Sequence, residues 1–114
     1  MAIQTATQKN NLATAYGAAA THAALYTTAP GGTAGTEPSG GSPAYARKAI
    51  SWGAPSNGVI TGTVTFDVPS GATIVGAGVH TAITAGTYLD GGSVTSQAFA
   101  SQGTYQLTLT YTQT

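Results

Sequence analysis

Residues 58–68 read GVITGTVTFDV, and apolar side chains alternate with polar ones along this stretch. The apolar face of the extended chain holds Ile60, Val64, Phe66 and Val68, and the polar face holds Thr61, Thr63, Thr65 and Asp67. An alternation with a period of two is typical of a half-buried β-strand. The stretch therefore predicts a strand with one face in a core.

Residues 104–113 repeat this alternation. Tyr105, Leu107, Leu109 and Tyr111 face one way, and Gln106, Thr108, Thr110 and Thr112 face the other. Further strands are expected at 21–28, 44–52, 72–81, 86–90 and 93–100, with turns at Pro69-Ser70-Gly71 and Asp90-Gly91-Gly92. About seven short strands with Gly and Pro between them indicate a mainly β fold, an antiparallel β-sandwich or jelly-roll-like domain.

The N-terminal segment differs from the rest of the chain. Residues 3–16 are the one helix candidate, with Thr5 or Thr7 as its cap and Gly17 as its end. Residues 30–43, PGGTAGTEPSGGSP, are a Gly/Pro-rich loop that is either a solvated surface loop or an arm at an interface. We expect one domain over 1–114, made of a helical arm (1–17), this loop and the main strands (44–114).

Charge is nearly absent. Only three basic and three acidic residues occur among 114, and they cancel. No basic surface exists to neutralise phosphates, which argues against a nucleic-acid partner. Charged residues usually protect exposed strand edges from association. Their scarcity implies that strand edges are covered by assembly or by other parts of the chain.

Several other classes are also disfavoured. The chain has no cysteine, so disulfides and thiolate metal sites are not expected. The start, Met1-Ala2-Ile3-Gln4-Thr5, lacks the pattern of a secretory signal peptide, and no apolar run is long enough for a membrane span. We therefore expect no membrane partner and no cofactor.

Residues able to do chemistry are few. The bases are His22 and His80, and the acids are Glu37, Asp67 and Asp90. No nucleophile elbow accompanies them, so a hydrolytic triad is not predicted. Both histidines are interpreted as packed or strand-edge residues rather than bases. Asp90 is interpreted as a turn residue, because a single carboxylate is too little for a calcium site. The sequence predicts no catalytic residue, no metal ligand and no enzyme.

Candidate interface residues come from charge and aromatic content. Tyr and Trp often anchor interfaces, which makes Tyr45, Trp52 and Tyr88 candidates, although Trp52 also fits a core position. Arg47 and Lys48 are the only adjacent charges and point to opposite faces of the expected strand. An alternative interpretation is that at least one of these two cations pairs with an acid of a neighbouring subunit.

Several stretches resemble a known group of proteins. They are Leu25-Tyr26-Thr27, PGGTAGTEPSGG, Tyr45-Ala46-Arg47-Lys48-Ala49-Ile50-Ser51-Trp52, Phe66-Asp67-Val68-Pro69-Ser70-Gly71-Ala72-Thr73-Ile74 and Gly103-Thr104-Tyr105-Gln106-Leu107. In this order, over about 20–110, they resemble small tail-fibre-like or head-decoration-like virion proteins of tailed bacteriophages, notably those infecting actinobacteria. These motifs are turns and strand cores, and they mark no catalytic residue.

The resemblance implies a non-enzymatic structural protein of the virion, assembled in the host cytoplasm. The leading expectation is a minor capsid protein that decorates or cements the capsid surface as a homo-oligomer, a trimer or a dimer. The alternative is a minor tail or tail-fibre protein involved in host attachment, with carbohydrate binding as an option. The partners implied are further copies of the chain and either the major capsid protein or tail proteins. A free carbohydrate-binding module is a further class, which would bind sugar as an isolated monomer.

Overall fold

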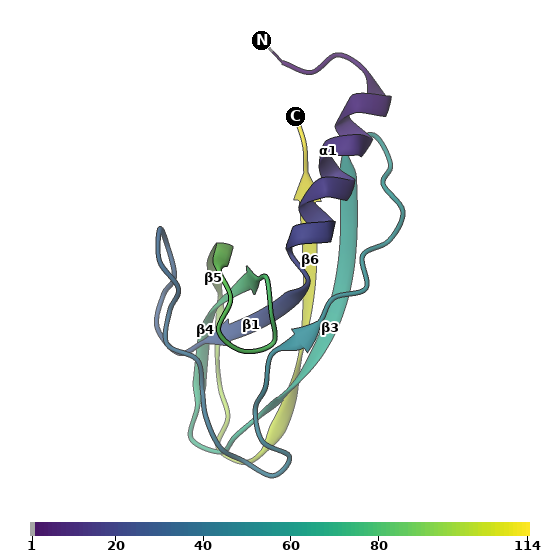
Figure 1. Cartoon of the computed structure of the whole chain (residues 1–114). Coiled ribbons are helices and arrows are strands. Elements are labelled where there is room, and N and C mark those ends of the chain that lie inside the picture. Colours follow the sequence, from purple (N-terminus) through teal and green to yellow (C-terminus); the bar gives the residue numbers. More distant parts are fainter. Residues whose placement is uncertain (1) are drawn as a thin grey trace.

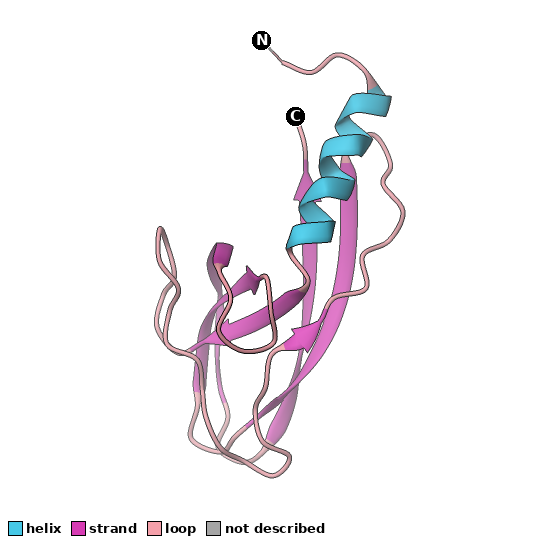
Figure 2. Ribbon diagram, viewed as in Figure 1, coloured by secondary structure: helices cyan, strands magenta, loops and turns pink. Residues whose placement is uncertain are grey.

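The computed structural model describes residues 2–114, so Met1 of the expected arm lies outside the described residues. Within this range the chain forms one helix and six strands (Figure 1). The elements are α1 (Ala6–Ala19), β1 (His22–Tyr26), β2 (Lys48–Ala49), β3 (Val59–Val68), β4 (Thr73–His80), β5 (Tyr88–Ala98) and β6 (Gly103–Thr112). The molecule is elongated, with extents of 47 × 25 × 24 Å. Most of the chain is strand or loop, as Figure 2 shows, so the predicted mainly β class is confirmed.

The strands form two antiparallel sheets. The larger has the order β2-β1-β4-β5, and the smaller consists of β3 and β6. β3 and β6 pair over their full length, from Val59 opposite Thr112 to Val68 opposite Gly103. In Figure 1 these two strands run side by side, with α1 along their upper part. The arrangement is sandwich-like, as the strand pattern predicts.

The core lies between the two sheets. On β3, Ile60, Val64, Phe66 and Val68 are buried, and Thr61, Thr63 and Thr65 are exposed. β1, β4 and β6 complete the core with Leu25, Ile74 and Leu107, among others. The alternation in 58–68 therefore identifies the buried face correctly.

The helix is displaced relative to its prediction. It spans 6–19 rather than 3–16, and Gly17 lies inside it. Thr5 is the N-cap, as expected, and its hydroxyl accepts a hydrogen bond from the amide of Gln8. A Cβ on Gly17 would lie 3.1 Å from Cδ1 of Trp52 and 3.2 Å from Cδ1 of Ile60. Glycine at this position lets the helix pack closely against the sheet, and the helix ends only where Ala20 begins the turn into β1.

The strand expected over 44–52 is wrong for most of its length, because only Lys48–Ala49 is strand. The backbone of this segment changes partner as it proceeds. The amide of Tyr45 bonds to Gly40, that of Ile50 to Thr21 and that of Gly53 to Thr61. A segment that passes from the 30–43 loop to β1 and then to β3 cannot form one regular ladder.

The turn predicted at Asp90-Gly91-Gly92 is also wrong. Residues 88–98 form the single strand β5, with Gly91 opposite Gly78 and Gly92 opposite Ala77. The Asp90 carboxylate accepts a hydrogen bond from the amide of Gly91, but the chain does not reverse direction here. Two register irregularities in the β4–β5 pairing accommodate this segment, and the reversal occurs at 81–87 instead. The described chain therefore has six strands rather than about seven.

Candidate interaction surfaces

Arg47 joins two loops of the chain. Its Nη2 donates to Oε2 of Glu37 at 2.9 Å, and its Nε donates to both carboxylate oxygens. Its Nη1 donates to the carbonyls of Ala82 at 3.1 Å and Ala85 at 2.8 Å. Glu37 belongs to the 30–43 loop, and the two alanines belong to the β4–β5 connection. We call Arg47, Glu37 and Tyr45 the loop latch, because Tyr45 donates to the same carboxylate at 2.8 Å.

The latch is held in its charged form. Burial raises the pKa of the Glu37 carboxyl, but the hydrogen bonds from Arg47 and Tyr45 and the positive charge of Arg47 outweigh burial and hold it below its usual value. Burial raises the pKa of the Tyr45 phenol above its usual value. The phenol hydroxyl also accepts a hydrogen bond from the amide of Leu25 at 3.0 Å, which connects the loop latch to β1.

Lys48 forms a looser pair. Its Nζ lies 3.6 Å from Oδ2 of Asp67 on β3, and its side chain is 39 % exposed. Each of the two adjacent cations thus has an acid partner within its own chain, on opposite sides of the segment. Contact with an acid of a neighbouring subunit stays a prediction.

The histidines are packed residues. His80 is 3 % exposed, and its Nε2 shares a hydrogen bond with the hydroxyl of Tyr26. Burial, and then the charge of Arg47, lower the pKa of His80 below its usual value. The Nδ1 of His22 shares a hydrogen bond with the Thr21 hydroxyl at 2.9 Å. Within residues 2–114 no cluster of three or more His, Cys, Asp or Glu could hold a metal ion.

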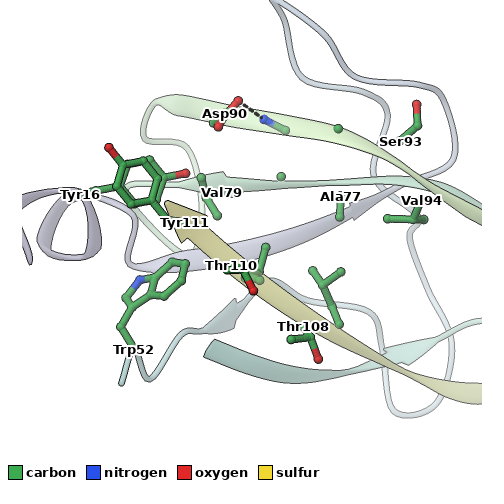
Figure 3. A pocket seen from close by; sticks show the side chains of 15 residues that line it. Tyr16, Trp52, Ala77, Val79, Asp90, Ser93, Val94, Thr108, Thr110 and Tyr111 are labelled. Atoms are coloured by element: carbon green, nitrogen blue, oxygen red, sulfur yellow. Dashed lines mark hydrogen bonds between the residues drawn. The ribbon is translucent and has the colours of Figure 1, made fainter. Parts of the chain in front are cut away.

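A groove of about 230 Å³ opens between β4 and β5 on one side and β6 on the other. Figure 3 shows Val79, Ala77 and Val94 on one wall and β6 on the other. Tyr16 of α1 and Tyr111 of β6 stack at one end with ring centroids 3.9 Å apart, and Trp52 meets Tyr16 edge-on at 6.1 Å. We call this space the aromatic groove.

The aromatic groove also carries polar side chains, among them Ser93, Thr108 and Thr110. Burial, and then the nearby Asp90 carboxylate, raise the pKa of Tyr16 to about 12, so its phenol is neutral at physiological pH. The indole nitrogen of Trp52 donates to the carbonyl of Ala20 at 2.9 Å. The groove is an uncharged cleft apart from Asp90, with nothing in it that indicates acid–base chemistry.

The structure separates the five predicted interface residues. Tyr45 and Arg47 meet in the loop latch, Lys48 pairs with β3, and Trp52 lines the aromatic groove. The hydroxyl of Tyr88 donates to the carbonyl of Gly31 at 2.8 Å. Sequence reasoning missed Tyr16 and Tyr111 as groove residues. Each was visible only as a member of an apolar stripe, one on the helix and one on the last strand.

Comparison with models of known protein families identifies a match. The model of the podophage GP4 fiber I protein gp80 family matches residues 4–110. The chain belongs to this family of phage fibre proteins. The resemblance to virion proteins of tailed phages is therefore confirmed, and the match favours the tail-fibre alternative over capsid decoration. Searches of curated proteins and of solved structures found no match.

As a fibre protein the chain is a non-enzymatic structural component of the virion. It associates with other proteins of the particle. Over the part of the chain that the structure covers, no helix is long and apolar enough to cross a membrane.

Proposed function

We propose that this fibre protein is a building subunit of a tail fibre, that it assembles as a homo-oligomer, and that it contributes to host attachment through that assembly. The match to a fibre family over 4–110 carries this proposal. The loop latch supports it, because a domain whose loops are fastened by an internal ion pair suits a repeated structural part. The nearly uncharged surface supports it too, since copies of such a domain do not repel one another.

A carbohydrate-binding site within this domain is a weaker candidate function. Sugar recognition on a surface uses exposed aromatic ring faces, and every aromatic side chain within 2–114 is buried or half-buried. In the aromatic groove, Tyr16 and Tyr111 already cover one face of each other. Assembly therefore accounts for these residues better than a sugar platform does.

The proposal is tested with phage particles that lack this chain. We expect DNA-filled heads of normal heat stability, loss of a fibre in electron micrographs, and reduced adsorption to host cells. Adding the purified protein during assembly should restore both fibre and adsorption. Normal fibres and normal adsorption without the chain would contradict the proposal, and so would heads that burst.

A further inference from the structure

The last strand of the chain has one unpaired edge. The amide of Gln113 bonds to the carbonyl of Gly58, and the β3–β6 register runs without a shift from this point. In an antiparallel pair, hydrogen-bonded positions alternate with positions whose amides and carbonyls point away. The odd-numbered residues of β6 therefore bond to β3. The groups that point away belong to Thr104, Gln106, Thr108, Thr110 and Thr112.

No strand within residues 2–114 pairs with this outer edge. β3 is the one strand paired with β6, and no hydrogen bond outside the sheets involves the outward amides and carbonyls of 104–112. Natural proteins protect such edges with charges, proline or bulges. The stretch 91–114 contains no charged residue and no proline, and the β3–β6 ladder contains no bulge.

The surroundings of the edge are suited to contact with protein. Beside it lies the aromatic groove, where Leu109, Tyr111 and Val94 remain half-buried. On the opposite face, threonines of β3 and β6 lie across from each other, as in Thr63 opposite Thr108 and Thr61 opposite Thr110. Covering these threonines desolvates no ion.

We propose that the outer edge of β6 pairs antiparallel with β6 of a second copy, so that the two β3–β6 ladders form one continuous four-stranded sheet. This inference rests on the homo-oligomer in the proposed function. A two-fold axis at Thr108 places Thr108 opposite itself, and Gln106 opposite Thr110 of the second copy. Every outward group then finds a partner, with up to about ten backbone hydrogen bonds per pair of chains.

The other sheet edges fit this role less well. β5 is also a sheet edge, but it carries Asp90 and its pairing is irregular, both features that oppose strand addition. β2 at the far edge has two residues. The outer edge of β3 is already used in part, because the carbonyl of Thr61 accepts a hydrogen bond from the amide of Gly53. Pairing with the β6 strand of a second copy gives hydrogen-bond partners to two unpaired edges at once. It needs no protein other than further copies of this chain.

Single cysteines test the pairing directly, because the natural chain has none. Directly opposed residues of a hydrogen-bonded antiparallel pair lie at a Cα separation of about 5.5 Å, within reach of a disulfide. Thr108→Cys should give a covalent dimer under mild oxidation. Thr63→Cys is the matched control, since Thr63 lies opposite Thr108 on the same exposed face but on β3, and it should remain uncrosslinked.

Variants of Thr110 test the backbone contribution. Thr110→Pro removes an amide that points away from β3, so the fold should persist while the dimer dissociation constant rises roughly 10–100-fold. Thr110→Val keeps this amide and should dimerise like the natural chain. Thr110→Lys places a charge on the edge and provides a second disruptive variant, should the proline variant fail to fold.

The outcomes separate this inference from the proposed function. A natural chain that is dimeric by analytical ultracentrifugation, with crosslinking at position 108 and weakening at position 110, supports the pairing. An oligomer that survives Thr110→Pro and Thr110→Lys, or that crosslinks equally at 63 and 108, overturns the pairing and leaves the homo-oligomer standing. A natural chain that is monomeric at every concentration overturns both.

Discussion

The Arg47 guanidinium and the Glu37 carboxylate form a forked ion pair that closes the 30–43 loop onto the body of the domain. Nε contacts both carboxylate oxygens, and Nη2 contacts one of them at 2.9 Å. The side chains are only 13 % and 26 % exposed. The same guanidinium also donates to the carbonyls of Ala82 and Ala85. This one ion pair therefore joins the 30–43 loop to the β4–β5 connection.

Glu37→Gln should lower the free energy of unfolding by about 2 kcal/mol, because it leaves the partly buried Arg47 without a counter-charge. In a chain of this size that corresponds to a fall in Tm of roughly 8 °C, measurable by differential scanning calorimetry. Lys48→Gln is the control. It removes the longer and more exposed pair with Asp67, and it should cost less than about 0.5 kcal/mol. An effect of Glu37→Gln as small as that of the control would show that the latch does not stabilise the fold.

Stability should fall on acidification in two stages. The pKa of His80 is lowered in the folded protein, so the unfolded chain binds the proton first as pH falls below the ordinary value of 6.5. The pKa of Glu37 is also lowered, and its contribution is lost below its ordinary value of 4.5. Urea unfolding midpoints measured across this range should therefore decrease with falling pH. In His80→Asn the first stage should disappear and the second should remain.

Gly78 should be intolerant of a side chain. A Cβ at this position would lie 2.6 Å from the hydroxyl of the buried Tyr26 and 2.9 Å from the carbonyl of Asp90. Gly78→Ala should therefore destabilise the protein by about 2 kcal/mol through overpacking. Gly92→Ala, on the neighbouring strand, meets open space and should change the free energy of unfolding by less than about 0.5 kcal/mol. Chemical denaturation of the two variants gives the comparison.

The single tryptophan reports whether the helix is docked. Trp52 contacts Tyr16 of α1 edge-on and donates to the carbonyl that follows the helix. Tyr16→Ala should shift the fluorescence of Trp52 to longer wavelength and cost roughly 2 kcal/mol, because it removes a half-buried ring and its stack on Tyr111. Tyr16→Phe keeps the stack and should leave the emission unchanged. An unshifted emission in Tyr16→Ala would contradict the assigned packing of α1.

Sequence patterns predict the regular ladders best. The period-two alternation identifies β3 and β6 and their buried faces, because a long two-stranded pairing leaves each residue on a constant side. The pattern fails where backbone partners change along a segment, as between Tyr45 and Gly53. It also fails at Asp90-Gly91-Gly92, where pairing with β4 overrides a local turn signal.

The interaction surfaces are harder to predict from the sequence than the strands. The Tyr16–Tyr111 stack and the Glu37–Arg47 pair each depend on how distant segments meet. The scarcity of charge, by contrast, is visible from the sequence. The structure adds that the outer edge of β6 is a strand edge without charged residues.

The central claim is that this chain belongs to a tail fibre, and its position on the particle tests that claim most directly. A tag at the exposed C-terminal Thr114 can be labelled with gold on intact phage and located by cryo-electron microscopy. We expect a few labels per particle, all on fibres at the tail. Labels spread over the head shell in large numbers would contradict it.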